Sequence, residues 1–458
     1  MKTLKNEGTL ANRVDLETVY FALPPDFMQK RDGKCLLVWS FLPYWMVVTE
    51  QMLSLLTHFN GKRTLDSIIN ITIGLSDIPR KQYEKKVKDL VSRLLEAKIL
   101  SIKPEKLVID GKDNEGLKLE EITVAINDEF RTDTILSTEE LKVAIRSTFK
   151  HIKGKALLRV VGEKPNVNTE KLLTILKTAT YKGLNIILDL PTTAYTEELL
   201  NELMKVRVQV QITFDGPYAS LNDAIQGEGS FNRSVAVVTN LLSKKIYTII
   251  NMNVSEHNHQ EIETFLQLAN KLKVSECRVI PLKKIGKYKK FRPPDYREII
   301  NYLFKAVKKD PSYSKLLGRD VFTIFEQLLT LNENISSCPA GKGQLLLGAD
   351  GFIYPCIGLK LEQFRVANAQ EEHEEDYLET SNILQFLRKQ FPVSNSPTCA
   401  RCIIRFWCRS GCKGETIQNT FKAHNAALSC KSIQSAFIDM FWSISEYEEL
   451  IKPRQPFC

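Results

Sequence analysis

The sequence predicts an α/β protein built from three units: a small N-terminal winged-helix domain, a partial (β/α)6 barrel and a C-terminal domain rich in cysteine. Three observations predict it. Apolar residues near the N-terminus follow the order strand–strand–helix–helix–helix–strand, the middle of the chain alternates between strand and helix, and seven of the ten cysteines lie between residues 338 and 430. A chain of 458 residues is also long for a single core, which favours two or three domains.

The composition is that of an ordinary globular protein, with 43% hydrophobic and 26% charged residues. The net charge of +9 comes with scattered lysines, which slightly favours acidic peptide or protein partners. The sequence has no basic motif interleaved with aromatic residues, so we expect no nucleic-acid partner. It also lacks the apolar segment of a secretory signal and any run of about 18 apolar residues. We therefore expect a cytoplasmic protein without a membrane span.

Residues 1–105 form the first predicted unit. Two strands are expected near Asp32–Phe41 and Tyr44–Val48, on either side of a turn. Thr64 is typical of the N-cap of a short helix, and the apolar positions between Val87 and Leu95 repeat at helical spacing. The segment "AKILSIKP" then returns as a strand. Another helix precedes Thr64, and its apolar face is formed by Met52, Leu55, Leu56 and Phe59.

Two segments of this unit, "GKRTLDSII" and "KDLVSRLLEAKIL", resemble the PqqD-like family, a winged-helix element that recognises precursor peptides in peptide-modifying pathways. The resemblance covers about residues 20–105 and depends on the placement of apolar residues. It implies that a leader peptide adds as an extra strand to the edge of a sheet and packs against the last helix. In such β-augmentation, backbone hydrogen bonds supply affinity and side-chain pockets supply selection. The alternative is a generic winged helix that only caps the next domain.

A polar segment, residues 106–120, leads into a second predicted unit, which we place at residues 116–320. Strands here alternate with amphipathic helices in repeats of about 25–35 residues, which predicts a parallel sheet wrapped by helices. Right-handed crossovers would curl this sheet into a partial barrel whose working end lies at the carboxyl ends of the strands. The strand candidates are Glu121–Ile126, Ala156–Val161, Asn185–Leu190, Val208–Phe214, Tyr247–Val254 and Glu276–Ile280.

The segment from Gln211 to Leu241 resembles the six-stranded barrel of radical SAM enzymes. Members of that family carry here a strand ending in S-x-D-G, then a helix and R-G-x-G-x-F. This chain has the turn Asp215-Gly216-Pro217 and, further on, Gly227-Glu228-Gly229-Ser230-Phe231. A dinucleotide-binding loop explains these glycines less well, because no G-x-G-x-x-G follows a strand.

The third predicted unit, residues 330–440, contains the seven clustered cysteines, and residues 441–458 form a C-terminal tail. The segment "CARCIIRFWCRSGC" has the spacing C-x2-C-x5-C-x3-C, and "GFIYPC" carries another cysteine upstream. Thiols this dense in a charged intracellular chain are metal ligands more often than disulfide partners. Seven is too many for one tetrahedral site and one too few for two four-cysteine sites. The pattern therefore favours two metal centres, one of them with an open position.

The seven-cysteine pattern resembles the SPASM domain, an extension with two iron–sulfur clusters on radical SAM enzymes that modify peptides and proteins. The resemblance implies two [4Fe–4S] clusters with interleaved ligands, so that cluster binding couples distant segments to folding. Auxiliary cluster I would have an open or exogenous fourth ligand and would take Cys338, Cys356 and Cys412. Auxiliary cluster II would take Cys399, Cys402, Cys408 and Cys430. A pair of structural zinc sites is the alternative that the C-x2-C spacing also permits.

An active radical SAM enzyme further needs C-x3-C-x2-C just after the first barrel strand, to hold the cluster that binds S-adenosylmethionine. The corresponding segment, residues 125–142, contains no cysteine, and none occurs between Cys35 and Cys277. Carboxylates are poor substitutes for thiolates on an iron–sulfur cluster. We interpret the carboxylates of this segment as solvated loop or helix-cap charges; they are Asp128, Glu129 and Asp133.

Two other positions depart from the radical SAM pattern. The G-G-E-P turn at the second strand, which receives the methionine amino group in that family, is Val161-Gly162-Glu163-Lys164-Pro165 here. Loss of a glycine adds a side chain where the backbone must approach a ligand closely. The usual T-N-G at the third strand is replaced by "LPTTA". We therefore expect a degenerate barrel with no catalytic residues and no bound S-adenosylmethionine.

The remaining residues with reactive or metal-binding side chains have simpler interpretations. His257 and His259 are expected at a polar surface, and Phe406 and Trp407 are expected to shield a cluster from water. Cys35 and Cys277 are expected to be small buried apolar residues, whereas Cys458 is a minor candidate for the open ligand position. A solvated insertion is expected at the acidic run of Glu371, Glu372, Glu374, Glu375 and Asp376.

These resemblances imply a component of a system that matures a ribosomally made peptide. In this hypothesis the chain binds the leader of a precursor peptide at its N-terminal domain and holds iron–sulfur clusters. It then presents the peptide to a partner maturation enzyme, or transfers electrons, without being a radical SAM catalyst itself. One alternative is a peptide-modifying enzyme that uses the open cluster without S-adenosylmethionine. A structural scaffold with zinc is a third interpretation.

Overall fold

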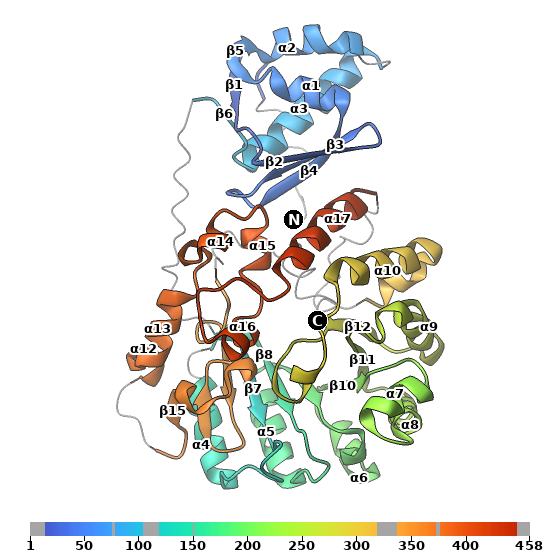
Figure 1. The fold of residues 1–458 in the computed structure, drawn as a ribbon, viewed down its shortest axis with the longest axis vertical. Helices are drawn as coiled ribbons and strands as arrows, with labels where there is room; N and C mark the ends of the chain where they lie inside the picture. Colours follow the sequence, from blue (N-terminus) through green and yellow to red (C-terminus); the bar gives the residue numbers. More distant parts are fainter. Residues whose placement is uncertain are drawn as a thin grey trace.

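A computed structural model describes residues 14–75, 78–103, 119–149, 152–317, 337–371 and 376–446. The polar connection predicted at 106–120 lies almost entirely outside these ranges, as do Cys458 and most of the predicted tail. The N-terminal domain lies at one end of the long axis of the molecule, and the central sheet with its helices lies at the other (Figure 1). The cysteine-rich segments lie between the two.

The N-terminal domain consists of two small antiparallel sheets and helices packed between them. One sheet is a meander of β2 (Phe27–Arg31), β3 (Lys34–Trp39) and β4 (Tyr44–Thr49). The other places β1 (Val19–Ala22) between β5 (Asn60–Thr64) and β6 (Leu100–Ser101). The helices are α1 (Glu50–Thr57), α2 (Leu65–Thr72) and α3 (Arg80–Glu96).

Sequence signals in this domain correspond to its local structure. Thr64 caps α2, because its hydroxyl accepts a hydrogen bond from the Ser67 N–H at 3.3 Å. The apolar stripe of α3 is buried in the core of the same domain, as its helical spacing predicts. Strands β1, β2 and β5 carry no comparable signal, since each is only four or five residues long.

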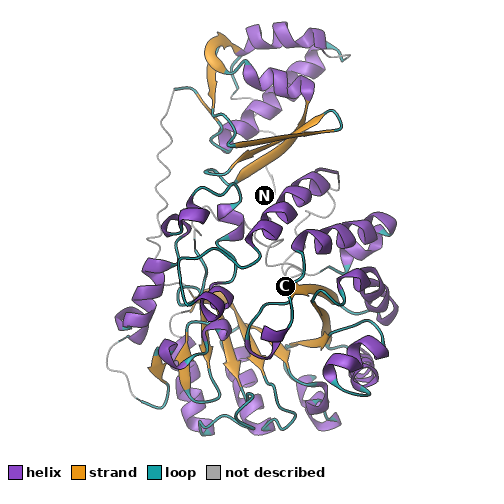
Figure 2. Ribbon diagram, in the orientation of Figure 1, coloured by secondary structure: helices purple, strands orange, loops and turns teal. Residues whose placement is uncertain are grey.

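The central sheet contains the six predicted barrel strands as parallel neighbours, in the order β12-β11-β10-β9-β8-β7. Their bounds are β7 (Leu119–Ala125), β8 (Ile152–Val161), β9 (Asn185–Asp189), β10 (Gln209–Phe214), β11 (Tyr247–Val254) and β12 (Glu276–Pro281). Helices surround the sheet (Figure 2), namely α4 (Thr138–Phe149), α5 (Thr169–Tyr181), α6 (Glu197–Leu203), α7 (Ala219–Gln226), α8 (Ser230–Ser243), α9 (Ile262–Leu272) and α10 (Tyr296–Lys309). We call the carboxyl ends of the six strands the barrel mouth.

The sheet continues beyond the barrel into the cysteine-rich segment. β13 (Gln344–Leu347) pairs in parallel with β7, and β14 (Phe352–Tyr354) and β15 (Ala367–Asn368) add to it in antiparallel. The sequence pattern does not predict this extension, because β13 is short and Gln344 contacts Glu121, a residue 223 positions earlier. β13 and β14 lie between Cys338 and Cys356, so the barrel sheet itself helps to position both cysteines.

Short helices make up most of the remaining cysteine-rich domain, and a long helix, α17, follows them. No helix in the described ranges combines the length and the apolar character that crossing a membrane requires. The α-helices are α12 (Tyr377–Thr380), α13 (Asn382–Gln390), α14 (Pro397–Ala400), α15 (Arg405–Cys408), α16 (Lys413–Thr420) and α17 (Cys430–Glu446). The described 3-10 helices are η2 (Ile73–Leu75), η3 (Thr192–Ala194), η4 (His259–Glu261), η5 (Gly286–Lys290), η6 (Pro311–Lys315), η8 (Ile357–Leu359), η9 (Glu362–Phe364) and η10 (Val393–Asn395).

Helix α17 joins the N-terminal domain to the barrel. Its Phe441 stacks on Trp45 of β4, with ring centroids 4.8 Å apart. Its Asp439 carboxylate pairs with Arg31 of β2 at 2.9 Å and with Arg297 of α10. One side chain of α17 therefore binds residues from the first and the second predicted units at the same time.

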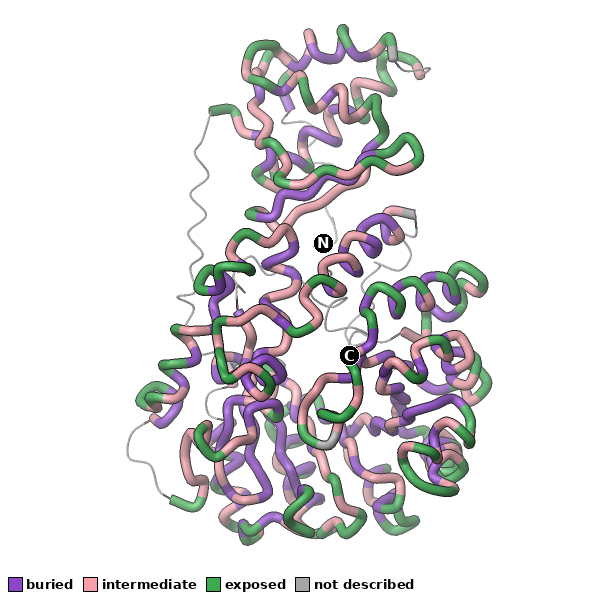
Figure 3. Tube along the Cα trace, in the orientation of Figure 1, coloured by how far each residue is buried: buried purple, intermediate pink, exposed green. Residues whose placement is uncertain are grey.

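The meander β2-β3-β4 is packed on both faces. Leu36 and Val38 of β3 belong to the large core that includes α17, whereas Leu37 and Trp39 belong to the core of the N-terminal domain. All four side chains are at most 2% exposed, and β3 is buried along most of its length (Figure 3). This two-sided burial explains why β3 is a continuous apolar run rather than an alternating strand.

Replacing the shared carboxylate should weaken the attachment of the N-terminal domain. In Asp439→Asn, the free energy of unfolding should fall by about 1–2 kcal/mol, because two arginines lose a largely buried counter-charge. Thermal or urea unfolding measures this change. As a control, Glu50→Gln removes an exposed pair with Lys30 and should change stability by less than about 0.5 kcal/mol. Equal effects of the two substitutions would contradict the role assigned to Asp439.

Candidate metal centres

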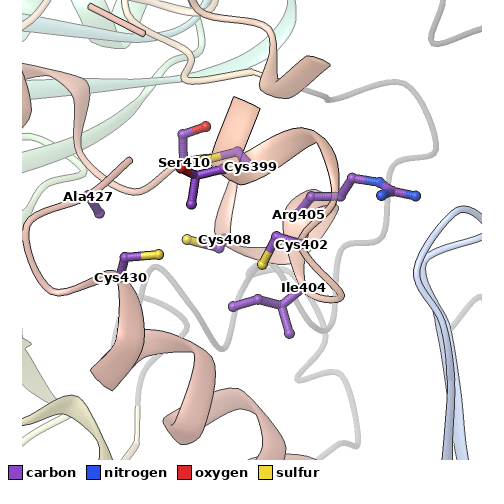
Figure 4. A pocket seen from close by; sticks show the side chains of 9 residues that line it. Cys399, Cys402, Ile404, Arg405, Cys408, Ser410, Ala427 and Cys430 are labelled. Atoms are coloured by element: carbon purple, nitrogen blue, oxygen red, sulfur yellow. The ribbon is translucent and has the colours of Figure 1, made fainter. Parts of the chain in front are cut away.

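Four of the predicted ligands line a single pocket. Cys399 lies in α14, Cys402 follows it, Cys408 ends α15 and Cys430 begins α17. Their side chains surround a common space that is partly open to solvent (Figure 4). The structure thus brings together the four cysteines that the sequence analysis assigns to cluster II, and their binding of a metal stays a prediction.

A sharp turn separates this pocket from the next predicted ligand, Cys412. Three consecutive residues, Arg409, Ser410 and Gly411, have positive φ angles of 52°, 67° and 68°. This left-handed backbone is strained for arginine and serine, and such strain persists only where the surroundings enforce it. A side chain at Gly411 would lie 2.5 Å from the Cβ atom of Ala427, so glycine is required there. The turn directs Cys408 and Cys412 toward different sites.

Unpaired donors around the pocket indicate what would fit it. The Nη2 atom of Arg405 and the hydroxyl of Ser410 are buried without a hydrogen-bond partner, and both residues line the pocket. Unpaired buried polar atoms are rare, and inorganic sulfide could accept a hydrogen bond from the Ser410 hydroxyl. The Arg405 guanidinium points away from the thiols (Figure 4) and lies over the ring of Phe41 at 3.7 Å. Among the described residues, no three histidine, cysteine or acidic side chains converge closely enough for a single metal ion.

The protonation of these thiols depends on their burial. Burial raises the pKa of Cys408, and the charges of Cys402, Cys399 and Cys430 raise it further. Burial likewise raises the pKa of Cys430, with added effects of Cys402 and Cys399. The thiols are therefore close enough to influence one another. Since ligands bind as thiolates, loading this site with metal must release protons.

The other three predicted ligands, those assigned to cluster I, form a group of their own. We call it the first group of thiols, and the four pocket cysteines the second group. Cys412 is the N-cap of α16, where its sulfur accepts a hydrogen bond from the Glu415 N–H at 3.5 Å. Burial raises the pKa of Cys356, and the charges of Cys338 and Cys412 add to this effect. Three mutually interacting thiols thus gather at one place. The barrel contributes Lys283, whose pKa is raised chiefly by the charge of Cys412.

Two glycines bring the segments of this first group into contact. A side chain at Gly414 of α16 would lie 2.7 Å from the carbonyl oxygen of Gly358, a residue of η8. Gln418 donates a hydrogen bond to that same carbonyl at 2.9 Å. This close approach places Gly358, two positions after Cys356, next to the helix that begins after Cys412.

At the barrel mouth, Asn127 fills the turn that follows β8. Its Oδ1 atom accepts hydrogen bonds from the N–H groups of Glu163 at 2.7 Å and Lys164 at 3.0 Å. Its Nδ2 atom donates to the carbonyls of Lys164 at 3.0 Å and Asn166 at 2.9 Å. A side chain at Gly162 would meet the same Oδ1 atom at 3.0 Å. A buried side chain therefore occupies the turn in which the radical SAM resemblance would place the methionine amino group.

The interpretation of Asp128 as a solvated charge is wrong. Asp128 is 5% exposed and forms an ion pair with Lys360 of the cysteine-rich domain. Glu129, by contrast, is exposed as expected, and Asp133 pairs with Lys171 at 3.3 Å. The sequence does not reveal the pairing of Asp128, because its partner is 232 positions away. The ion pair fastens the loop after β7 to the cysteine-rich domain.

Inside the barrel, a polar network connects side chains of three strands. Gln211 of β10 donates a hydrogen bond to Asp189 of β9 at 2.7 Å and accepts one from Arg278 of β12 at 3.1 Å. Arg278 also pairs with Glu276. Burial raises the pKa of Asp189. Sequence reasoning misses this network, although single polar residues in otherwise apolar strands are the signal that could have indicated it.

The other singled-out residues have ordinary surroundings. Cys35 and Cys277 are fully buried, as expected, and Trp407 is fully buried in contact with Phe441. His257 is exposed, and His259 lies 3.1 Å from Glu298. In the acidic run, Glu371 is exposed and Asp376 caps α12, while residues 372–375 lie outside the described ranges.

Comparison with curated proteins identifies distant relatives. A cysteine-type anaerobic sulfatase-maturating enzyme of Clostridium perfringens is 23% identical over 298 residues, 61% of this chain and 80% of that protein. A mycofactocin maturase of Mycobacterium ulcerans is 26% identical over 212 residues, 45% of this chain and 56% of that protein. An uncharacterised protein of Archaeoglobus fulgidus is 28% identical over 236 residues, 49% of this chain and 55% of that protein. The two named relatives are radical SAM maturases.

Solved structures share the fold. The C. perfringens enzyme anSMEcpe, with bound AdoMet and Cp18Cys peptide, superposes with a TM-score of 0.58 at 16% identity, covering 72% of this chain and 99% of that one. Streptococcus suis SuiB, bound to its precursor peptide SuiA, superposes with a TM-score of 0.56 at 13% identity, covering 90% and 98%. No family model matches the chain. The chain has the α/β fold with a large parallel sheet of radical SAM maturases, and its relatives are consistent with a radical SAM/SPASM peptide maturase family.

The ion pair between Asp128 and Lys360 should make stability depend on pH. Burial alone would raise the pKa of Asp128, but the Lys360 ammonium and the Phe130 and Arg131 N–H groups hold it below its ordinary value. A carboxyl with a lowered pKa stabilises the fold above its unfolded pKa, and this contribution is lost as pH falls through the folded pKa. Lys360→Met should therefore cost about 1–3 kcal/mol at neutral pH and progressively less as the pH falls below about 4, the ordinary pKa of an aspartate.

Urea unfolding of both proteins across this pH range measures the difference. The control Lys142→Met removes an ion pair with Glu139, a glutamate that is 79% exposed, and should have little effect at any pH. A loss in Lys360→Met that is equal at acid and neutral pH would refute the assignment.

Proposed function

We propose that this chain is a component of a system that matures a ribosomally made peptide, in which it binds the precursor peptide and two [4Fe–4S] clusters but does not cleave S-adenosylmethionine. The observation that carries the proposal is the contrast between the cysteine-rich domain and the barrel mouth. Seven thiols gather in two groups in the cysteine-rich domain. The barrel mouth, where the relatives' chemistry would require three more, has a buried asparagine instead.

The two groups of thiols are suited to different tasks. Cluster II would be held by Cys399, Cys402, Cys408 and Cys430, a complete set of four. Cluster I would be held by Cys338, Cys356 and Cys412, which leaves one position for another ligand. When bound, such clusters supply one-electron transfer. The chain itself contributes burial, the unpaired donor Ser410 and apolar shielding by Trp407, and these features would tune the potential of a cluster.

Three features support the absence of S-adenosylmethionine chemistry. The segment after β7 has no cysteine. Asn127 makes four hydrogen bonds to the turn after β8 and closes the space above Gly162. The next residue, Asp128, forms an ion pair with Lys360. The loop that would carry the missing cysteines is therefore attached to the cysteine-rich domain. The hydrogen bonds of Asn127 and the ion pair of Asp128 each satisfy a buried polar group. A ligand bound at this place would have to displace these contacts.

The N-terminal domain is the proposed site for the leader of the precursor. Both faces of the meander β2-β3-β4 are covered, so a peptide strand has access only to its edges. β2 pairs with β3 alone, and its Met28 and Lys30 are exposed. Such an edge can accept an added strand through backbone hydrogen bonds. The bound precursor peptide in SuiB, a protein of similar fold, supports this use of the fold by a peptide.

The chain's role toward the peptide is then to present it to a partner maturation enzyme or to carry electrons for that enzyme. A second function is favoured by one observation. The buried network of Asp189, Gln211 and Arg278 retains a polar barrel interior, which a purely structural barrel would not need. This network would suit an enzyme that modifies the peptide without S-adenosylmethionine. A mass change of the precursor after incubation with the reduced protein alone would select this alternative.

The cluster content can be measured on protein reconstituted under anaerobic conditions. Iron and sulfide should suffice for two [4Fe–4S] clusters and not for three, and dithionite with S-adenosylmethionine should yield no 5′-deoxyadenosine. Cys408→Ala should lower the iron content by up to about half, because it removes a ligand of one complete set. Cys277→Ala, at a buried cysteine of a barrel strand, should leave the iron content unchanged. Stoichiometric zinc, or turnover of S-adenosylmethionine, would overturn the proposal.

Peptide binding can be tested with a fluorescent precursor peptide. Anisotropy should show that the precursor binds to the full chain and that binding depends on its leader. The affinity for the peptide should fall when the backbone of the β2 edge next to Gln29 or Arg31 is blocked. Met28→Pro removes one backbone donor from this strand and should weaken binding about tenfold or more. The control is Met204→Ala, at an exposed residue at the far side of the barrel. Equal affinity of native and Met28→Pro protein would exclude this edge.

A further inference from the structure

Lys413 is a buried cation between the two groups of thiols. Its side chain is 1% exposed, although lysine is almost never fully buried without a charged partner. Its ammonium donates a hydrogen bond to the carbonyl of Asn425 at 3.0 Å. No carboxylate in the described part of the chain forms an ion pair with it, so this charge has no conventional counter-ion there. A buried ammonium without a negative partner would be strongly destabilising.

The position of Lys413 shows what can compensate its charge. On one side, it directly follows Cys412, and its backbone N–H is hydrogen-bonded to Cys338, so its main chain belongs to the first group of thiols. On the other side, its ammonium reaches Asn425, in the segment that continues to Ala427 and Cys430, which line the pocket of the second group. The residue therefore spans the space from one group to the other.

The electrostatic surroundings agree with this geometry. Burial lowers the pKa of Lys413, and the negative charges of Cys399, Cys338 and Cys408 oppose this effect. Two of these thiols belong to the second group and one to the first. Iron–sulfur clusters ligated by thiolates carry net negative charge, and their reduction potentials depend on nearby charge and burial. A fixed positive charge favours the reduced form of each cluster, because reduction adds an electron.

We propose that Lys413 is the shared counter-ion of the two clusters and raises the midpoint potentials of both, that of cluster II more than that of cluster I. This inference rests on the proposed binding of two clusters. Lys413 acts as a positioning and tuning residue, since it contacts the ligand segments rather than a substrate. Because the ammonium is buried, its effect is screened little by salt.

The test compares two substitutions in the full chain, reconstituted under anaerobic conditions. Lys413→Met removes the charge and keeps an unbranched side chain of similar length, whereas Lys413→Arg keeps the charge. Iron and sulfide content, followed by redox titrations monitored by electron paramagnetic resonance, gives cluster occupancy and midpoint potentials. The signals are assigned with Cys356→Ala for cluster I and Cys408→Ala for cluster II. Lys422→Met, at an exposed lysine near the end of α16, is the control.

We expect Lys413→Met to retain its iron and to shift both midpoint potentials to more negative values, with the larger shift for cluster II. Lys413→Arg and Lys422→Met should stay close to the native potentials. If Lys413→Met assembles no clusters but Lys413→Arg assembles both, the charge is required and the inference holds. Native potentials in iron-loaded Lys413→Met, or failure of both variants to assemble clusters, would overturn it. Absence of iron from the native chain would instead refute the proposed function.

Discussion

The parallel pairing of β7 with β13 is the contact on which the arrangement of the candidate sites depends. It places β7 between β8 and β13, so the first barrel strand is an interior strand of a longer sheet. Cys338 precedes β13 and Cys356 follows β14, and both are therefore held by the same sheet that carries the barrel mouth. Without this pairing, the thiols of the first group would have no fixed position relative to the barrel.

The barrel mouth and the cysteine-rich domain share further contacts at their boundary. Lys360 pairs with Asp128 after β7, and the Lys284 N–H after β12 donates to the Glu415 carboxylate at 2.8 Å. Asn419 of α16 donates to the carbonyl of Lys284 at 2.9 Å. The two ends of the strand series are thus fastened to one domain, and the loops between them are limited in how far they can open.

Sequence patterns predict this architecture where the signal is local. The six barrel strands, the helix that Thr64 caps and the stripe of α3 all follow from periodicity and capping, because these depend on neighbouring residues. The partition of thiols into two groups follows only from the resemblance to a known pattern. The contacts that close the barrel were not predictable, since Asn127 and Asp128 meet groups up to 232 positions away. Lys413 carries no signal in the sequence, because a lysine next to a cysteine is equally common at a solvated surface.

Asp439 of α17 forms ion pairs with both Arg31 and Arg297. This contact affects the order in which parts of the protein can fold during synthesis. On the ribosome, the N-terminal domain emerges first and has its own core, but one face of its meander must wait for α17, the last described helix. Leu36, Val38 and Trp45 would meanwhile remain open to water and to other nascent chains. Synthesis of α17 is therefore needed to cover this face, and a translation product that stops before α17 would be exposed to aggregation even with its first domain folded.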